Sequence, residues 1–212
     1  TLENSMVNKI IRGGVKLYKY DAETEAHTPQ GGAVVQDAVF EIVNRSANAV
    51  LVNGVSYASG EVVYAAKTDD SGLFQTAADL LPYGTYEVRE ISPPTGYTGD
   101  GTTSRTFSIE QNGVVVDLTD FERAISNEVI RGGVKLYKYD IESQEHVGQG
   151  EATVAGVKFE IVNRTGGNVV VNGITYTDGQ VVYTGYTDEN GLFETAADLL
   201  PYGHYEVCEA TP

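Results

Sequence analysis

The chain repeats its own sequence at a constant offset of 119 residues. The run IRGGVKLYKYD at 11–21 returns at 130–140, and TAADLLPYG at 76–84 returns at 195–203. An unbroken offset of this length indicates two copies of one domain rather than a solenoid of short units. The repeat predicts a complete domain at 10–128, a second domain at 129–212 that lacks its last strands, and at 1–9 the tail of a preceding copy.

Composition excludes several classes of function. A net charge of -16 and a pI of about 4.4 oppose binding to nucleic acid or to anionic membranes. We find no apolar stretch long enough to span a bilayer and no signal peptide, so we expect no membrane insertion of this segment. The single cysteine excludes an internal disulfide framework, so an extracellular chain of this kind needs another stabilising cross-link.

The local pattern is that of an all-β protein. Short alternating runs rich in β-branched and aromatic residues are separated by Gly, Asn, Asp and Pro, which predicts an antiparallel sandwich or barrel in each of the two copies. Asn53-Gly54 and Asn172-Gly173 predict type I′ hairpins. Only 75–81 could hold a helical turn, and the short linker 128–133 predicts a semi-rigid connection between the copies. The strands expected in the first copy are 15–21, 38–44, 49–53, 61–68, 73–76, 86–91, 105–110, 114–120 and a last one ending at Asn127.

Strand alternation sends three polar side chains toward the core. Lys19 shares a strand face with Leu17, Glu90 shares one with Val88, and Asn127 follows the same alternation in the last strand. Burial lowers the pKa of a lysine and raises that of a glutamate. A neutral amine is a nucleophile, and a protonated carboxyl can polarise an amide carbonyl and carry protons to departing ammonia. These residues therefore predict an amide bond between Lys19 and Asn127, with Glu90 as the proton shuttle.

Two simpler interpretations remain open for these residues. Lys19 could be an ordinary edge charge, because lysine is rarely buried. Lys19 and Glu90 could also form a salt bridge without covalent chemistry.

The spaced motifs resemble those of a known family. They are L-x-K-x-D at 17–21, Y-x-V-x-E-x-x-x-P-x-G-Y at 86–97 and N-x-x-x-x-G-x-V-x-L-x-K at 127–138. This order is similar to the Cna B-type, prealbumin-like domains of pilins and stalks in Gram-positive surface proteins, and VFEIVN at 39–44 is similar to their VaFE-type repeats. The resemblance implies an all-β fold, with two tandem copies of an antiparallel Greek-key sandwich.

The resemblance implies which residues form an isopeptide bond. In the family, a lysine of the first strand bonds to an asparagine or aspartate of the last strand with the help of a glutamate. The pattern carries over to Lys19, Asn127 and Glu90, and in the second copy to Lys138 and Glu209, whose asparagine partner is absent from the chain. Asn8 would accept the lysine of a preceding repeat.

We therefore expect a structural stalk or pilus-like shaft module of an extracellular, cell-wall-anchored protein, with neighbouring repeats as partners. A strand from another chain could complete the second domain. The chemistry is single-turnover self-cross-linking, without cofactor or metal, rather than enzymatic turnover. The alternative is an adhesin module that binds a host ligand through loops or the outward Tyr18 and Tyr20, repeated at Tyr137 and Tyr139.

Other polar motifs carry less weight. The acidic loops 69–72 and 188–191 lack the full calcium-loop pattern and are expected to be turns. The scattered His27, His146 and His204 do not form a metal cluster in the sequence. Cys208 is expected on an outward strand face as an incidental thiol.

Overall fold

The computed structural model describes residues 6–99 and 103–211, and within these ranges all regular structure is β-strand. The chain divides into two compact units. Unit 1 comprises Thr1–Thr28 and Val35–Glu128, and unit 2 comprises Pro29–Val34 and Val129–Pro212. Across the described ranges, no helix of the length and hydropathy needed to cross a membrane occurs.

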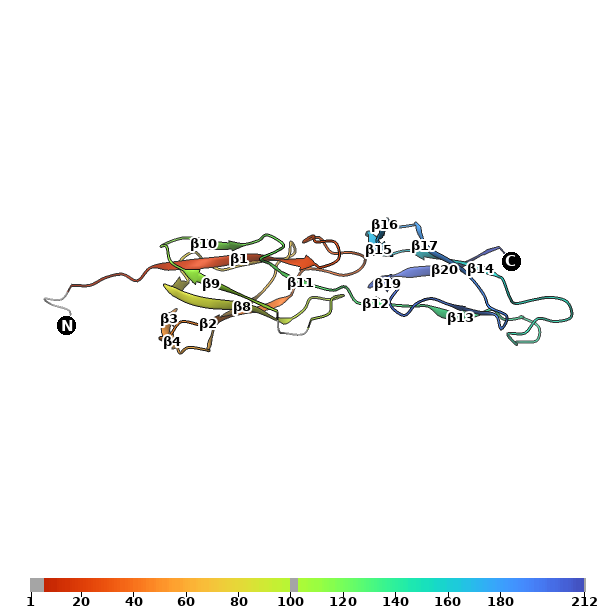
Figure 1. The fold of residues 1–212 in the computed structure, drawn as a ribbon, viewed down its shortest axis with the longest axis horizontal. Helices are drawn as coiled ribbons and strands as arrows, with labels where there is room; N and C mark the ends of the chain where they lie inside the picture. Colours follow the sequence, from red (N-terminus) through yellow and green to blue (C-terminus); the bar gives the residue numbers. More distant parts are fainter. Residues whose placement is uncertain (1–5, 100–102, 212) are drawn as a thin grey trace. The chain divides into compact units, whose positions relative to one another are not determined.

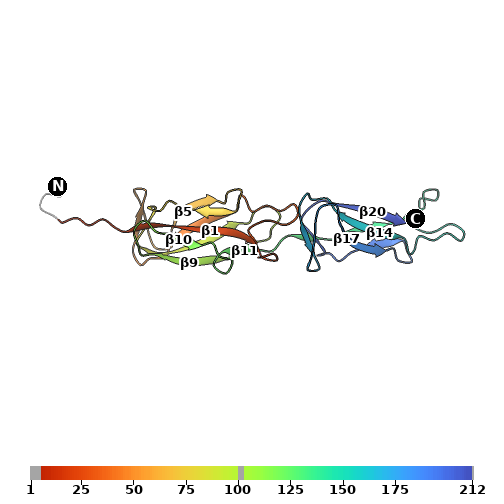
Figure 2. The same cartoon turned by 90° about the horizontal axis from the view of Figure 1, so that it is seen from above.

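Unit 1 is built around an antiparallel sheet and a long first strand (Figures 1 and 2). The sheet has the order β5-β2-β8-β9, and the first strand, β1, pairs with β6, β7, β10 and β11. A β3–β4 hairpin completes the unit. The strands are β1 (Arg12–Asp21), β2 (Val39–Asn44), β3 (Val50–Val52), β4 (Val55–Tyr57), β5 (Val62–Lys67), β6 (Leu73–Gln75), β7 (Leu81–Pro82), β8 (Gly84–Ser92), β9 (Ser104–Ile109), β10 (Val115–Leu118) and β11 (Ile125–Asn127).

The prediction of an antiparallel sandwich holds for the pairing of β1 with β6 and β7 but was wrong for its other two neighbours. β1 runs parallel to β10, with Gly14 opposite Val115, and parallel to β11, with Lys19 opposite Ile125. Periodicity reports which face a side chain takes but not the direction of the neighbouring strand. Because the first and last strands run in the same direction, the chain enters unit 1 beside one end of β1 and leaves beside the other (Figure 1).

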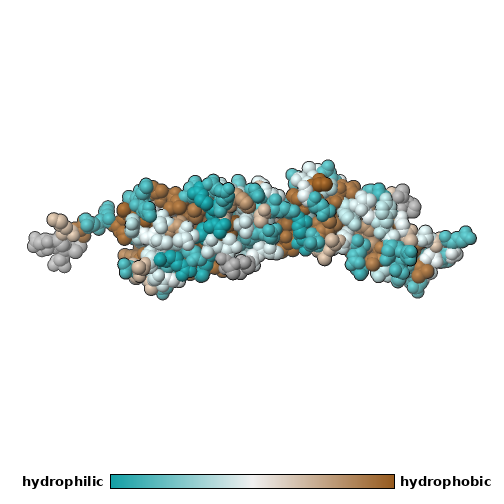
Figure 3. Space-filling view, viewed as in Figure 1, coloured by the Kyte–Doolittle hydropathy of each residue, from teal (hydrophilic) through white to brown (hydrophobic). Residues whose placement is uncertain are grey.

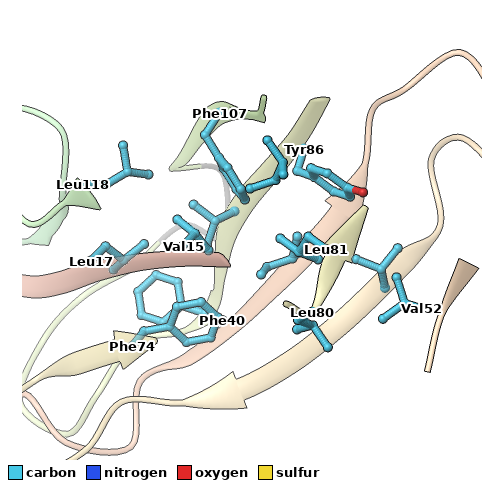
Figure 4. Packing of buried hydrophobic residues seen from close by; sticks show 14 of the residues in the cluster. Val15, Leu17, Phe40, Val52, Phe74, Leu80, Leu81, Tyr86, Phe107 and Leu118 are labelled. Carbon is cyan, nitrogen blue, oxygen red and sulfur yellow. The ribbon is translucent and has the colours of Figure 1, made fainter. Parts of the chain in front are cut away.

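Alternating apolar side chains form the core between β1 and the antiparallel sheet (Figure 4). Val15 and Leu17 point inward from β1 and have no exposed surface. The Phe40 and Phe74 rings pack at 5.3 Å between centroids. The Tyr86 ring is fully buried and its hydroxyl donates to the Pro82 carbonyl at 2.8 Å, so its polar end is satisfied. The faces that alternation predicted for β1 and β8 are those in the structure.

Most strand predictions agree with the structure to within a few residues. The hairpin turns are confirmed: Asn53 and Gly54 have φ of 50° and 82°, and Asn172 and Gly173 have 52° and 75°. Two consecutive positive φ angles define the type I′ turn. The segment 75–81, which could have held a helical turn, contains no helix. It holds a single reverse turn, in which the Leu80 N–H donates to the Ala77 carbonyl at 3.3 Å. The two-residue strand β7 was not anticipated.

Unit 2 repeats much of this arrangement. Its three-stranded sheet has the order β17-β14-β20, and pairs β12–β19, β13–β18 and β15–β16 accompany it. Leu136, the equivalent of the fully buried Leu17, is only half-buried. The strands are β12 (Arg131–Gly132), β13 (Lys135–Tyr137), β14 (Lys158–Asn163), β15 (Val169–Val171), β16 (Ile174–Tyr176), β17 (Val181–Tyr186), β18 (Leu192–Glu194), β19 (Leu200–Pro201) and β20 (Tyr205–Thr211).

Candidate cross-link site

Lys19 lies near the end of β1 with its side chain inside unit 1. It has no exposed surface, and its Nζ donates to the Tyr20 carbonyl at 3.2 Å and to the Ile125 carbonyl at 3.3 Å. Desolvation lowers the pKa of Lys19 to about 8, against the opposing effect of the Glu90 and Asp21 carboxylates. The neutral, nucleophilic amine is therefore accessible at pH values near neutrality.

Glu90 lies between the other two predicted site residues. It points inward from β8 and is 2% exposed. Its Oε1 lies 3.8 Å from Lys19 Nζ, and its Oε2 accepts a hydrogen bond from Asn127 Nδ2 at 2.7 Å. One carboxyl group therefore contacts both the amine and the carboxamide, which is the placement that a proton shuttle requires.

Strand register places Asn127 beside Lys19. The parallel pairing of β1 and β11 sets Ile125 opposite Lys19 and Asn127 opposite Asp21. Asn127 is 6% exposed. Because two positions separate Lys19 from Asp21, the lysine and Asn127 project from the same face of neighbouring strands. The structure thus brings Lys19, Glu90 and Asn127 together in unit 1.

Asp21 and Tyr97 complete the surroundings of the site. The Tyr97 hydroxyl donates to Asp21 Oδ2 at 2.8 Å, and Lys19 Nζ lies 5.8 Å from the centre of the Tyr97 ring. Asp21 Oδ1 accepts from the backbone N–H groups of Glu23 and Thr24, each at 2.9 Å. Sequence reasoning assigned neither residue a role, although alternation already placed Asp21 on the face of Lys19.

A reverse turn brings Tyr97 over the site. The Tyr97 N–H donates to the Pro94 carbonyl at 3.2 Å, and Gly96 between them has a φ of 90°, which favours glycine. Further along, the Thr98 N–H donates to the Glu128 carbonyl at 2.8 Å. A Cβ on Gly99 would lie 3.1 Å from Asn127 Nδ2. The segment after β8 therefore packs closely against the carboxamide.

The equivalent residues of unit 2 form a more open pair. Lys138 Nζ contacts Glu209 Oε2 at 2.7 Å, and the two side chains are 33% and 26% exposed. Among the hydrogen bonds of the described residues, none joins an asparagine side chain to this pair. Asn8, the other predicted acceptor, lies in an exposed segment outside the strands.

The remaining candidate motifs are structural. Asp69 Oδ1 accepts from the backbone N–H groups of Ser71 and Leu73, each at 2.9 Å, and Asp188 makes the equivalent contacts, so both acidic loops are turns as predicted. Over the ranges 6–99 and 103–211, no group of three or more His, Cys, Asp or Glu side chains could hold a metal ion. Cys208 is a partly exposed free thiol on β20.

The outward tyrosines of β1 pack against their own unit. The Tyr18 ring stacks on His27 at 4.3 Å, and the Tyr20 hydroxyl donates to the Thr119 carbonyl at 2.7 Å. In unit 2 the equivalent Tyr137 and Tyr139 are 39% and 54% exposed. On the face drawn in Figure 3, hydrophobic residues form small groups separated by hydrophilic ones.

Comparison with known proteins identifies the domain type. The family model of the SpaA prealbumin-like fold domain matches residues 13–122, just over half of the chain. No curated protein matches the chain.

Among solved structures, the match with a TM-score above 0.5 shows the same fold. The TIE protein of Bacillus anthracis matches with a TM-score of 0.57 and 22% identity, over 95% of this chain and 29% of that one. A streptococcal ancillary pilin matches with a TM-score of 0.39 and 20% identity, over 96% and 55% of the two chains. The shaft pilin SpaA of Lactobacillus rhamnosus GG matches with a TM-score of 0.38 and 15% identity, over 86% and 81%. The chain thus spans less than two thirds of the length of the first two structures.

The motif order, the all-β fold and the matched family model agree. The resemblance to Cna B-type domains inferred from the sequence is confirmed, and the chain belongs to the family of SpaA prealbumin-like fold domains.

Proposed function

We propose that this chain is a structural module of a cell-surface stalk, locked by an isopeptide bond that unit 1 forms within itself. One observation carries the proposal: a single buried carboxyl, Glu90, contacts both the Lys19 amine and the Asn127 carboxamide. Removing a lysine and a glutamate from water costs free energy, and a non-covalent ion pair often recovers no more than this cost. Buried pairs of this kind are common at functional sites, and a self-formed bond is a function that these two residues fit.

The proposed reaction is an amide exchange. The lone pair of neutral Lys19 Nζ attacks Asn127 Cγ, and the Cγ–Nδ2 bond then breaks. Glu90 takes a proton from Nζ and returns it to Nδ2, which leaves as ammonia. The products are one new amide, between Nζ and Cγ, and one ammonia, so no oxidant or cofactor is required. Fixed geometry in a desolvated site supplies the rate enhancement. Each chain reacts once, so the protein is not an enzyme in the usual sense.

The parallel pairing of β1 and β11 gives the bond a mechanical role. Lys19 and Asn127 both lie near the end of unit 1 where the chain departs toward Glu128. A pulling force that enters at Arg12 would pass along β1 to Lys19, cross the bond and leave at Asn127. The residues between them would carry no load. This arrangement suits an extracellular shaft, with neighbouring repeats of the same protein as its partners.

The test of the bond is the intact mass of the folded chain. We expect a deficit of one ammonia, lost in Glu90→Ala. The matched control is Glu87→Ala, because Glu87 lies on the outward face of the same strand and contacts Arg45 at 2.6 Å. A native mass equal to that of the plain sequence would leave Lys19 and Glu90 as a non-covalent pair and would refute the proposal.

Unit 2 is proposed to hold the lysine half of a second site. Lys138 and Glu209 are in contact and accessible, so a strand that carries an asparagine could complete them. A synthetic peptide of residues 115–129 contains such a strand. Incubation should yield an adduct of chain plus peptide minus one ammonia, absent with Glu209→Ala and with a peptide carrying Asn127→Ala. An unmodified chain after prolonged incubation would contradict this part of the proposal.

The alternative function, adhesion to a host ligand, depends on the exposed aromatics of unit 2. Tyr137, Tyr139 and His146 lie within 6.5 Å of one another between ring centroids. In unit 1 the equivalent Tyr18 and Tyr20 are only partly exposed, because Tyr18 stacks on His27 and the Tyr20 hydroxyl bonds to the Thr119 carbonyl, which favours the stalk. Binding of the chain to host cells that is lost in Tyr139→Ala would favour adhesion instead.

A further inference from the structure

A short glycine-containing segment is inserted into a groove of unit 2. Residues Pro29–Val34 belong to this unit. The Gly31 N–H donates to the Asn168 carbonyl at 2.6 Å, and the Gly32 N–H donates to the Tyr202 carbonyl at 2.9 Å. The Gln30 side chain accepts from the Val170 N–H at 3.1 Å, and Gln30 is only 3% exposed. The segment therefore binds through three hydrogen bonds to main-chain groups.

The fit of this segment depends on glycine. Gly31 has a φ of 60°, and a Cβ there would lie 2.5 Å from the Tyr202 carbonyl oxygen. A Cβ on Gly32 would lie 3.3 Å from the Cα of Gly203. Only a segment with glycine at the first of these positions can approach the groove so closely.

Unit 1 has a groove at the equivalent position. It has a volume of about 630 Å³, and its lining includes Arg12, 46–51 and 82–85. By the repeat offset, Ala49, Leu51 and Tyr83 of unit 1 correspond to Asn168, Val170 and Tyr202 of unit 2.

The same arginine contact occurs beside both grooves. Arg12 Nη2 donates to the Leu51 carbonyl at 2.8 Å, and Arg131 Nη2 donates to the Val170 carbonyl at 3.0 Å. Since the groups that bind the segment in unit 2 belong to the main chain, the differences in side chains between the repeats do not remove them.

Unit 2 also displays the matching segment. Gln149 and Gly150 correspond to Gln30 and Gly31, and Gly150 has a φ of 59°. The same turn closes both segments. The Ala152 N–H donates to the Gln149 main-chain carbonyl at 2.9 Å, and the Ala33 N–H donates to the Gln30 main-chain carbonyl at 3.1 Å. Gln149 and Gly150 are exposed. The segment therefore has its binding conformation before it meets a groove, which lowers the entropic cost of binding.

We propose that the groove of unit 1 receives the Gln149-Gly150 segment of a second copy of this chain, as the groove of unit 2 receives Gln30-Gly31. The donor and the acceptor are different surfaces, so the contact is heterologous and joins copies head to tail. The partner is thus a copy of the same repeat, recognised by main-chain hydrogen bonds and by glycine. This contact does not depend on the isopeptide bond.

Two differences between the repeats should make the contact weak in the native chain. Asn48 of the unit 1 groove stands where unit 2 has Gly167, and a Cβ on Gly167 would lie 3.2 Å from the Gly31 carbonyl oxygen. Glu151 stands where the bound segment has Gly32. Both differences add side-chain atoms at a close approach. Asn48→Gly and Glu151→Gly should therefore strengthen the association.

The experiment is sedimentation equilibrium of the full chain over a range of concentrations. We expect association that is about fivefold weaker in Gln149→Ala, because one hydrogen bond is lost. The double variant Asn48→Gly, Glu151→Gly should associate about tenfold more tightly, because crowding is relieved. Gln111→Ala is the matched control, since Gln111 is an exposed glutamine outside the lining of the groove.

The variants also separate this proposal from the isopeptide bond. Glu90→Ala should associate as tightly as the native chain, whether or not its intact mass shows the loss of ammonia that reports the bond. A double variant that stays monomeric at millimolar concentration would overturn the proposal, as would association that Gln149→Ala leaves unchanged.

Discussion

The Asn127 side chain donates a 2.7 Å hydrogen bond to Glu90, whose second oxygen lies 3.8 Å from the Lys19 amine. These contacts join three strands, β1, β8 and β11, whose residues are far apart in the sequence. The carboxamide is held by the group that would deliver a proton to its nitrogen. The geometry therefore favours departure of ammonia once the amine attacks.

Removal of the shuttle should leave the fold intact but less stable. We expect Glu90→Gln to retain the full mass of the chain, because glutamine cannot carry the proton. A bond from Lys19 to Asn127 closes a loop of about one hundred residues. By analogy with a disulfide, its loss should lower the free energy of unfolding of unit 1 by about 4–5 kcal/mol, measured in urea. Glu87→Gln should keep both the deficit of one ammonia and the urea midpoint of the native chain. Equal stability of the two variants would argue against a covalent bond.

Formation of the bond should depend on pH. The pKa of Lys19 is lowered to about 8 by desolvation, so below pH 8 the neutral fraction falls about tenfold per pH unit. The rate of ammonia loss, followed by mass after refolding from denaturant, should rise from pH 6 to about 8 and then level off. A rate independent of pH over this range would mean that deprotonation of Lys19 is not required.

The unlinked lysine should also give stability a distinctive pH dependence. In Asn127→Ala, which cannot react, the folded state releases the Lys19 proton near pH 8, whereas the unfolded state keeps it to about pH 10.5. The unfolded state therefore binds more protons in this window, and stability should rise with pH. We expect a gain of about 2 kcal/mol between pH 7 and 9.5. The gain should be absent when Lys19→Met is added, and its persistence there would assign it to another group.

The contact of Tyr97 with Asp21 should contribute to the stability of the site. Tyr97→Phe keeps the ring over Lys19 and removes the donor to Asp21 Oδ2, so we expect a loss of about 1–2 kcal/mol with the cross-link still formed. Tyr64→Phe, whose ring packs on Phe74, is the control. Thermal unfolding and intact mass together test this expectation, and a stability equal to that of the control would exclude the contribution.

Replacement of Gly14 by a larger residue should lower the stability of unit 1. A Cβ there would lie 2.5 Å from the Ala77 carbonyl oxygen, a backbone atom that cannot move away easily. We expect Gly14→Ala to destabilise unit 1 by about 1–3 kcal/mol. Gly132→Ala is the control, because no atom outside its chain neighbours lies within 4 Å of the added Cβ. Equal urea midpoints for the two variants would show that the strand shifts without cost.

The sequence alone determined the repeat, the strands and the inward faces. A two-residue period fixes which side chains share a face, so the burial of Lys19, Glu90 and Asn127 could be predicted without knowledge of strand order. The hairpin at Asn53 could be predicted because its conformation is a local property of Asn-Gly.

Only the tertiary structure decided how distant segments pair. The parallel direction of β11 along β1, the contact of Tyr97 with Asp21 and the insertion of Gln30 beside Val170 each join segments far apart in the chain. Periodicity carries no information about such pairings, because it is the same for parallel and antiparallel neighbours and for any partner of suitable shape. The sequence thus placed the side chains of the candidate site inside the domain, whereas packing brought them within reach of one another.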